Sequence, residues 1–193
     1  MSTFVDYSNK YGLGYSLDDG SCGVYFNDST LLGAEPTHKH YFYVVNPSHS
    51  SETIFFAQEE LPKDRNFTKK SLLFERFEMY LKEEAEDKEN MCELKKKNNF
   101  IFVKQWLKTK HAIMFRLSNG IFQVDFFDKS QLLLSTVKKV ILFRSKEGEK
   151  TIETLNDALH ETNSQMSRRI KYTREILNSL KKGPREGPKE ERK

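Results

Sequence analysis

One segment of this chain is repeated one hundred residues further along. Residues 17–32 align without a gap on residues 117–132. Both copies contain a glycine where a tight turn is expected, a stretch of alternating apolar residues, and an aspartate that starts a second turn before another strand. The repeat predicts two copies of one β-rich module, and a cleft between related modules is a natural place for a ligand. The identical pairs are Leu17/Leu117, Gly20/Gly120, Val24/Val124, Phe26/Phe126, Asp28/Asp128 and Leu32/Leu132.

The first module is predicted to be a sheet followed by one helix. Turn-forming residues such as Asp18–Gly20 and Asn46–Ser48 separate its strands. From about Thr68 the apolar residues adopt helical spacing, so a helix ending near Leu81 should lie across the sheet. The highly charged residues 82–90 indicate the end of this helix and the start of a linker. The strand candidates are Gly14–Leu17, Gly23–Phe26, Tyr41–Val45 and Thr53–Ala57.

The second module repeats this plan from about Phe100. Asn119-Gly120 is the strongest short hairpin signal in the chain. Along residues 122–126, alternation places the apolar side chains on a core face and leaves Gln123 and Asp125 on a face that is free to bind. The strand candidates are Ala112–Leu117, Phe122–Phe126, Leu132–Leu134 and Val140–Phe143.

One helix is predicted to close the second module. Apolar residues recur at helical spacing over Asn156–Leu180, and Gly183 and Pro184 end the pattern. The polar residues beyond them predict a disordered basic tail. The predicted organisation is a first module over 4–81, a linker over 82–99, a second module over 100–180 and the tail over 181–193.

Composition narrows the classes of function. The net charge is +4, and much of the positive charge lies in residues 95–97 and 181–193, as is typical of solvated linkers and tails. No apolar run approaches the ~20 residues of a membrane span. Cys22 and Cys92 lack metal-site spacing and no secretory signal is present, which favours a reduced intracellular compartment. Nucleic-acid and membrane partners are therefore not expected.

The chain contains no recognisable catalytic motif. Gly12-Leu13-Gly14 begins a Gly-x-Gly-x-x-Gly pattern, but Leu17 occupies the place of the third glycine. A Gly-Lys-Ser/Thr loop and the His-Arg-Asp and Asp-Phe-Gly signatures of kinases are also absent from the sequence. His38 and His40 have no partners at metal-site spacing, so they are interpreted as surface histidines. The sequence thus predicts no catalytic residue, no cofactor and no metal.

Several stretches closely resemble the polo-box domain of polo-like Ser/Thr kinases. Those near the start resemble the opening of that domain, and those in the second half resemble its second polo box. The similarity keeps its order and covers nearly the whole chain up to Leu180. The stretches that carry it are Phe4–Leu17, Gly23–Thr30, Trp106–Lys110, Leu117–Gly120, Gln123–Phe127 and Lys171–Arg174.

The resemblance implies an α+β fold made of two polo boxes. Each box would be a six-stranded antiparallel β-sheet with one α-helix, and the two boxes would pack as a β-sandwich. The repeat and the change of period predict the same division independently. The family's preceding kinase domain and short cap helix are not in this sequence, so we interpret the chain as a C-terminal fragment of a divergent polo-like Ser/Thr protein kinase.

The resemblance also implies a non-catalytic targeting and regulatory role. Domains of this family bind phosphorylated Ser/Thr peptides in the groove between the boxes, which localises the kinase to the centrosome, basal body, kinetochore or division site. The same domain restrains the kinase domain. The implied partners are therefore phosphorylated or unphosphorylated protein ligands and the protein's own kinase domain. The implied locations are cytoplasmic and cytoskeletal, with the nucleus as a further one.

The family's phosphopeptide-binding residues are only partly matched. Phe4 stands where a tryptophan is usual, which keeps an aromatic wall but loses the indole N–H donor. The family grips the phosphate with a His-x-Lys pair, and Lys129 and Gln131 align with its two members, so one cation remains. Lys129 can alternatively be an ordinary turn lysine. The predicted phosphopeptide-binding residues are Phe4, Val5, Asp6, Lys129, Ser130 and Gln131.

Three further positions depart from the family pattern. Ala85 and Glu86 align with a pair of leucines that cover the peptide, and Asp125 aligns with an asparagine. The carboxylates of Glu86 and Asp125 would repel a phosphopeptide if they face the groove. These departures predict that the dependence on phosphate is weakened.

An aromatic channel lies beside the peptide groove in some polo-box domains. Its lining maps here onto residues of the first module, which are also spaced as ordinary helix-on-sheet core. Both interpretations hold if the tyrosines keep their polar tips at the mouth of a pocket. The mapped residues are Val5 and a predicted hydrophobic pocket of Tyr7, Tyr11, Leu73, Phe77 and Tyr80.

Three alternatives remain open at this point. The chain could be a polo-box pair that binds unphosphorylated protein ligands, a homodimerising scaffold module, or an unrelated β-sandwich with no kinase attached.

Overall fold

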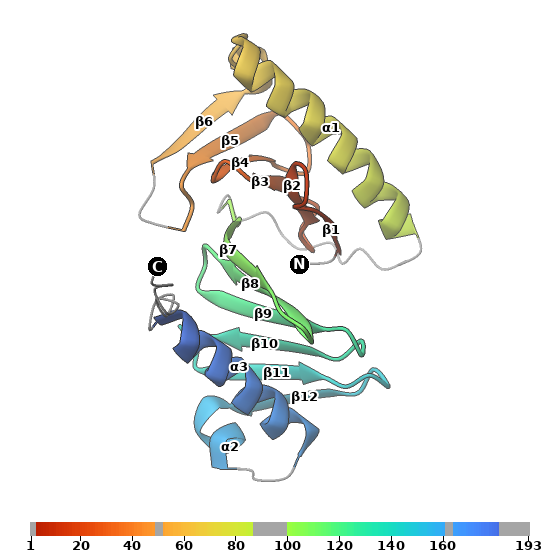
Figure 1. The fold of residues 1–193 in the computed structure, drawn as a ribbon, viewed down its shortest axis with the longest axis vertical. Coiled ribbons are helices and arrows are strands. Elements are labelled where there is room, and N and C mark those ends of the chain that lie inside the picture. Colours follow the sequence, from red (N-terminus) through yellow and green to blue (C-terminus); the bar gives the residue numbers. More distant parts are fainter. Residues whose placement is uncertain (1–2, 49–51, 87–99, 161–163, 182–193) are drawn as a thin grey trace, which may run out of the picture. The chain divides into compact units, whose positions relative to one another are not determined.

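The structure is a computed structural model that describes residues 3–48, 52–86, 100–160 and 164–181 (Figure 1). The chain divides into two compact units, Met1–Trp106 with Arg116–Asn119 and Leu107–Phe115 with Gly120–Lys193. Residues 100–106, which the sequence pattern assigned to the second module, group with the first unit. Their contacts explain this grouping. The Val103 amide donates a hydrogen bond of 3.2 Å to the Tyr15 hydroxyl, and the centroids of the Phe100 and Phe42 rings lie 5.6 Å apart.

The first sheet is an antiparallel meander in which strands follow one another in sequence order. Gly14 lies on β2 where the Phe77 ring approaches, and a Cβ there would come within 2.5 Å of that ring. Glycine therefore lets the helix pack closely against the strand. The elements are β1 (Thr3–Tyr7), β2 (Gly12–Ser16), β3 (Cys22–Phe26), β4 (Thr30–Ala34), β5 (His40–Val45), β6 (Thr53–Ala57), the 3-10 turn η1 (Gln58–Glu60) and α1 (Arg65–Glu86).

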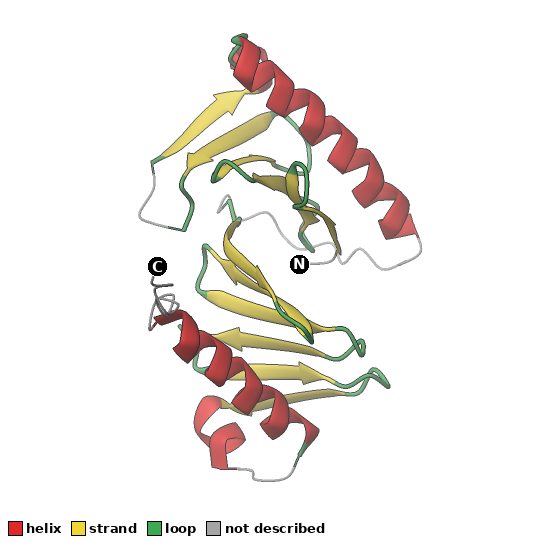
Figure 2. Ribbon diagram, in the orientation of Figure 1, coloured by secondary structure: helices red, strands yellow, loops and turns green. Residues whose placement is uncertain are grey.

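Helix α1 covers one face of the first sheet, as predicted (Figure 2). It begins after Asp64, whose carboxylate accepts from the amides of Asn66 and Phe67, both over 3.0 Å. Its buried aromatic residues pack on the inward side chains of the strands and form the core of this module. This cluster of buried residues includes Cys22, Val24, Phe26, Leu32, Ala34, Phe67, Phe74 and Phe77.

The buried thiol of Cys22 belongs to this core, with 6% of the residue exposed. Burial, and secondarily the nearby carboxylate of Glu78, raises the pKa of the thiol to about 12. Helix α1 itself continues to Glu86, into the stretch predicted as linker. The rest of that stretch, residues 87–99, and the predicted tail from residue 182 lie outside the described residues.

The second sheet repeats the six-stranded meander, again with all neighbours consecutive in sequence. Its inward residues meet Ala158, Met166 and Ile170 from the helices that follow it. None of the helices among the described residues is long and apolar enough to cross a membrane. The elements are β7 (Val103–Lys108), β8 (Ala112–Leu117), β9 (Ile121–Phe126), β10 (Gln131–Ser135), β11 (Val140–Arg144), β12 (Lys150–Thr154), α2 (Leu155–His160) and α3 (Gln165–Lys181).

The prediction of a single closing helix over Asn156–Leu180 is wrong. The structure places two helices there, α2 and α3, each with its own start. The Thr154 hydroxyl accepts from the Asp157 amide over 3.3 Å, and the Ser164 hydroxyl accepts from the Ser167 amide over 3.0 Å. A second hydroxyl cap in the middle of a periodic stretch marks a new helix, because it satisfies amides that have no partner in the preceding turn.

The repeat seen in the sequence is present in the fold. Gly20 and Gly120 turn the chain between matching strands with φ of 85° and 80°. In the following turn, Ser29 and Lys129 adopt left-handed conformations with φ of 61° and 72°. Two copies of one strand-turn-strand path are thus confirmed, including the residues that bear the backbone strain.

Candidate functional site

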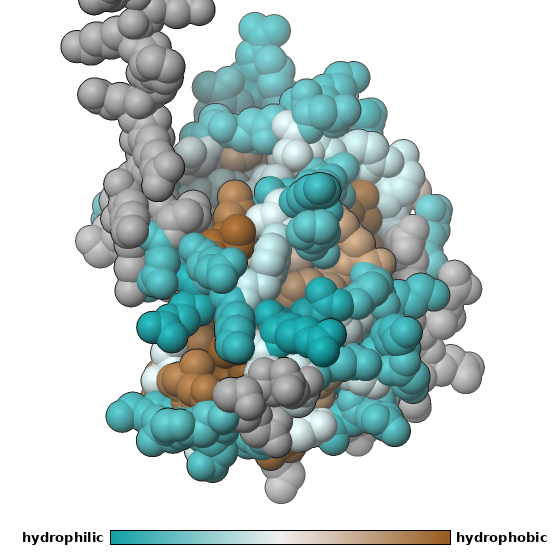
Figure 3. Space-filling view, turned by 60° about the horizontal axis from the view of Figure 1, so that its bottom comes forward, coloured by the Kyte–Doolittle hydropathy of each residue, from teal (hydrophilic) through white to brown (hydrophobic). Residues whose placement is uncertain are grey.

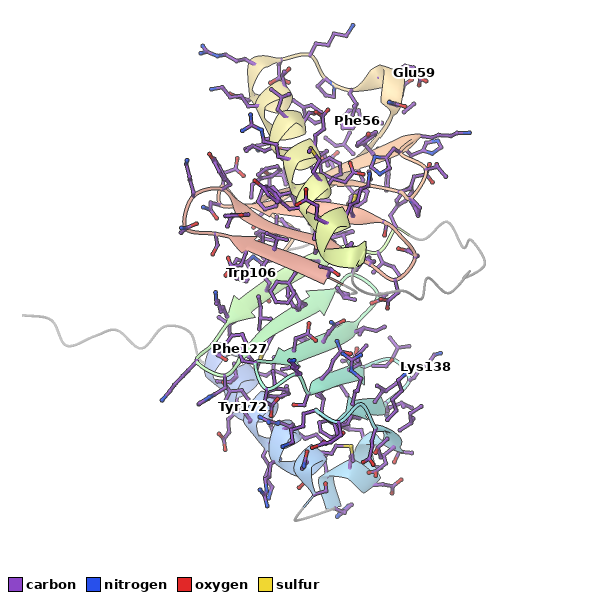
Figure 4. The ribbon with its side chains drawn as sticks, turned by 90° about the vertical axis from the view of Figure 1, so that its right-hand side faces the viewer. Phe56, Glu59, Trp106, Phe127, Lys138 and Tyr172 are labelled. Carbon is purple, nitrogen blue, oxygen red and sulfur yellow. The ribbon has the colours of Figure 1, made fainter. Side chains whose placement is uncertain are left out.

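The turn between β9 and β10 carries Lys129, the residue predicted to bind the phosphate. The Asp128 carboxylate accepts from the Ser130 amide over 3.1 Å and from its hydroxyl over 2.7 Å, while the Lys129 amide donates to Phe126 over 3.0 Å. These bonds fix the left-handed backbone at Lys129, whose side chain is exposed. The ammonium group is therefore carried on a rigid turn. Figure 4 shows Phe127 in this turn and Lys138 in the turn at the other end of β10.

Helix α3 holds the same turn in place. The Arg169 guanidinium donates to Asp128, and its centre lies 4.3 Å from the centroid of the Phe126 ring. Partial burial acts to raise the pKa of Asp128, but its hydrogen bonds from Ser130 and the charge of Arg169 outweigh it and hold the pKa below its ordinary value. Asp128 is therefore ionised at neutral pH and anchors the turn.

The first module has the same turn without the cation at its tip. Asp28 accepts from the Thr30 hydroxyl over 2.6 Å and pairs with Lys70 of α1 over 2.7 Å. The Lys70 ammonium also lies 5.4 Å from the centroid of the Phe26 ring. Ser29 occupies the position that Lys129 has in the second module. Both turns are thus tied to a helix, but only the second one offers a positive charge at its tip.

The other predicted donors in the second module already have partners. Ser130 is buried and its hydroxyl donates to Asp128. The Gln131 amide donates to Asp125 over 2.6 Å, and the Gln123 amide donates to the same carboxylate over 2.9 Å. Gln123 is 1% exposed, so the prediction that this side chain is free to bind is wrong. Two amide donors also offset the negative charge of Asp125.

Arg144 is a cation near this turn that the sequence analysis did not identify. It is exposed at the end of β11 and pairs directly with Gln131 across the strands. Directly opposed residues share one face of an antiparallel sheet, and their Cβ atoms lie about 5 Å apart. Arg144 thus stands beside the position where the resemblance places the family's lysine. The missing signal is the strand register, which aligns residues 131 and 144.

The predicted peptide-binding residues of the first module lie on β1. Phe4 pairs with Tyr15 of β2, and Val5 packs against the core. Asp6 accepts from the Ser8 amide over 3.0 Å and from its hydroxyl over 2.6 Å, so its carboxylate stabilises the turn that ends the strand. Ala85 and Glu86 belong to α1, but their side chains lie outside the described residues.

The predicted hydrophobic pocket divides into a buried and an exposed part. Phe77 is 3% exposed, and Leu73 and Tyr11 pack against the core. Tyr7 and Tyr80 are 40% and 48% exposed, and their ring centroids lie 5.9 Å apart. The Phe77 ring packs edge-on against the Tyr7 ring, and the two ring centroids lie 5.8 Å apart. A pair of tyrosines on an aromatic base is therefore accessible on this module.

Comparison with known proteins identifies the family. The profile described as the POLO box duplicated region matches residues 9–70 and 109–170, one match for each copy of the repeat. The chain is 32% identical over 155 residues to the probable serine/threonine-protein kinase CCRP1 of Zea mays, a match that covers 79% of this chain and 24% of that protein. It is 30% identical over 186 residues to the serine/threonine-protein kinase PLK1 of Xenopus laevis, covering 93% of this chain and 30% of the relative.

Solved structures agree with the fold. The polo-box domain of Cdc5 from budding yeast superposes with a TM-score of 0.72 at 22% identity, over 92% of this chain and 75% of that one. The same domain in complex with a Spc72 phosphopeptide superposes with a TM-score of 0.70, also at 22% identity and over 92% and 70% of the two chains. The chain spans less than a third of the two curated relatives named above. Because the family profile matches both modules and the fold agrees, this chain belongs to the polo-box family as a tandem polo-box domain.

Proposed function

We propose that this chain is a targeting module that binds Ser/Thr-phosphorylated protein ligands, with Lys129 and Arg144 as its phosphate-binding cations. The observation that carries the proposal is the exposed Lys129 on a turn fixed by Asp128, next to the register pair Gln131 and Arg144. A doubly charged phosphate accepts several charge-assisted hydrogen bonds, and arginine can supply two of them in parallel. Arg144 thus offers a replacement for the lysine that the family carries at the position of Gln131.

Family membership supports the wider part of the proposal. The Cdc5 domain is known in complex with a Spc72 phosphopeptide and with the Dbf4 polo-interacting region. By analogy, this chain would belong to a longer Ser/Thr kinase, localise it at a cytoskeletal structure and restrain its kinase domain. On the first module, Phe4, Val5 and Asp6 stay predicted contacts for the ligand.

The test compares a phosphothreonine peptide that has serine before the phosphate with its unphosphorylated twin, by calorimetry. Lys129→Asn removes the charge and tolerates the left-handed backbone. Lys139→Asn is the matched control, because Lys139 is exposed with φ of 54° in the turn after β10. We expect the wild type and the control to prefer the phosphopeptide, and Lys129→Asn and Arg144→Ala each to lower its affinity about 5-fold or more.

Two results would contradict the proposal. Equal binding of both peptides by the wild type would show that the domain does not recognise the phosphate. A phosphate preference untouched by Lys129→Asn and Arg144→Ala would place the phosphate elsewhere on the domain.

A second candidate function is phosphate-independent recognition of a protein ligand. The exposed pair Tyr7 and Tyr80 on the Phe77 ring favours it, because aromatic side chains often anchor protein interfaces. On the face drawn in Figure 3, apolar side chains show in several areas between hydrophilic ones. Tyr80→Ala should weaken binding of the unphosphorylated ligand while the domain stays folded. Unchanged binding by this variant would exclude the tyrosine pair as the anchor.

A further inference from the structure

Three side chains from separate elements of the first module converge on one point. Cys22 comes from β3, His38 from the turn before β5, and Glu78 from α1. One potential ligand atom from each lies within 4.8 Å of the other two. Local spacing predicts only a surface histidine at His38, because the two partners are 16 and 40 positions away in the sequence.

The geometry of this trio suits a small metal ion. Zn²⁺ bonds of about 2.0–2.3 Å place tetrahedral ligand atoms roughly 3.3–3.8 Å apart. His38 Nε2 already lies 3.2 Å from Glu78 Oε1. The remaining separations are at most 4.8 Å, so they need to close by about 1.0–1.5 Å at most. Changes of side-chain rotamer can supply a movement of this size. Helix α1 and the strands hold two of the three ligands on rigid elements.

The surroundings of the trio complete the pattern of a metal-binding histidine. The second ring nitrogen, Nδ1, lies 3.5 Å from the Tyr41 hydroxyl, which can accept a hydrogen bond from it. A polar partner on the second nitrogen fixes the ring and its tautomer in known metal sites. The centroid of the Phe74 ring lies 6.4 Å from that of the His38 ring and 6.0 Å from that of the Tyr41 ring. One side of the site is therefore apolar.

We propose that Cys22, His38 and Glu78 form a Zn²⁺ site with an open fourth position. Binding of Zn²⁺ displaces the proton of the Cys22 thiol into solvent. The resulting thiolate, imidazole and carboxylate together match the borderline-soft character of Zn²⁺, whereas Mg²⁺ and Ca²⁺ take oxygen ligands. The Lys82 ammonium, 2.5 Å from Glu78, competes for the carboxylate. Lys82 is largely exposed, so it can move into water when the metal binds. The ion would join α1 to the sheet, and this inference does not depend on the proposed phosphopeptide site.

The test uses Co²⁺ as a spectroscopic probe on the full chain, after metal has been removed with a chelator and in the presence of a phosphine reductant. We expect a thiolate-to-Co²⁺ charge-transfer band and the visible bands of tetrahedral cobalt, both abolished by added Zn²⁺. Cys92→Ser should keep these bands and Cys22→Ser should lose them. The absence of a charge-transfer band in the wild type, or its loss only in Cys92→Ser, would overturn the proposal.

Zn²⁺ affinity provides the quantitative arm of the test. His38→Asn suits the left-handed backbone at this position, where φ is 56°, so it should leave the fold intact. His40→Asn is the matched control, because that exposed histidine pairs with Glu35 outside the trio. We expect His38→Asn and Glu78→Gln to weaken Zn²⁺ binding about tenfold or more, and His40→Asn to leave it unchanged. Equally tight binding by His38→Asn would refute the site even where Cys22→Ser fails to fold.

Discussion

Phe77 and Tyr80 lie one helical turn apart on α1, but the fold gives them different roles. The Phe77 ring is buried against the strand at Gly14, where a side chain would collide with it. Tyr80 packs against Tyr7 and keeps about half of its surface in water. A residue whose burial is complete contributes to stability, whereas an exposed aromatic is available to a ligand.

This difference yields a prediction at the residue scale. Phe77→Ala should lower the free energy of unfolding by about 3–5 kcal/mol, because it leaves a cavity between α1 and β2. Tyr80→Ala, the matched aromatic control, should lower it by about 1 kcal/mol or less. Urea titration followed by tryptophan fluorescence and circular dichroism measures both values. Similar losses in the two variants would show that Tyr80 is also part of the core.

Sequence patterns predicted the residues of the core more completely than the side-chain contacts around the candidate site. Alternation assigned Val124 and Phe126 to the buried side, and the structure agrees. Gln123 was expected on an open face, yet its amide is buried on the Asp125 carboxylate. Arg144 was missed because its place beside Gln131 depends on strand register. Such pairing is set by the turn lengths between strands and is not visible in one strand alone.

At the scale of elements, each module contains the same link between a turn and a helix. Asp28 binds Lys70 of α1, and Asp128 binds Arg169 of α3. For Asp28, partial burial acts to raise the pKa, but hydrogen bonds from Lys70 and Thr30 outweigh it and keep the pKa below the ordinary 3.8. The same direction holds for Asp128. Both links therefore depend on ionised carboxylates.

The direction of these pKa shifts predicts how stability depends on pH. A carboxylate with a lowered pKa in the folded state stabilises fully above its unfolded pKa, and this contribution is lost as the pH falls through the folded-state value. Acidification from about pH 5 to pH 2 should therefore reduce the urea midpoint of the wild type more than that of Asp28→Asn/Asp128→Asn. Asparagine keeps the turn acceptors but cannot titrate. Parallel acid profiles for the two proteins would show that these carboxylates contribute nothing to acid sensitivity.

Most of the strands that residue patterns missed lie at sheet edges, and the interior strand β4 was indicated only by the repeat. Strands β1, β7 and β12 were not among the candidates read from residue patterns, and each is an edge strand. An edge strand has one neighbour and carries polar side chains; in β12 all residues but Glu153 are exposed. Alternation is therefore weak there. The resemblance to the polo-box family supplied the count of six strands per sheet that alternation could not.

At the scale of the whole molecule, the modules share a plan but differ in the charge they present. The matching turns carry Ser29 in one copy and Lys129 in the other. In the first module, Lys70 of α1 forms an ion pair with Asp28 and donates a hydrogen bond to the Tyr43 hydroxyl. In the second, Lys129 is exposed and Arg144 stands at the end of the neighbouring strand. The two copies thus share a framework, and the second one presents the cations of the proposed phosphate site.

This charge asymmetry predicts how salt affects ligand binding by the whole chain. The side chains of Lys129 and Arg144 are exposed. The Debye length falls from about 10 Å at 0.1 M salt to about 3 Å at 1 M, so charge interactions at these side chains are screened by salt. Raising the salt from about 0.05 M to 0.5 M should therefore weaken phosphopeptide binding several-fold and leave the unphosphorylated twin nearly unchanged. Calorimetry at each salt concentration measures both, with Lys129→Asn expected to show a shallower slope. An equal loss for both peptides would instead indicate non-specific attraction to a chain with a net charge of +4.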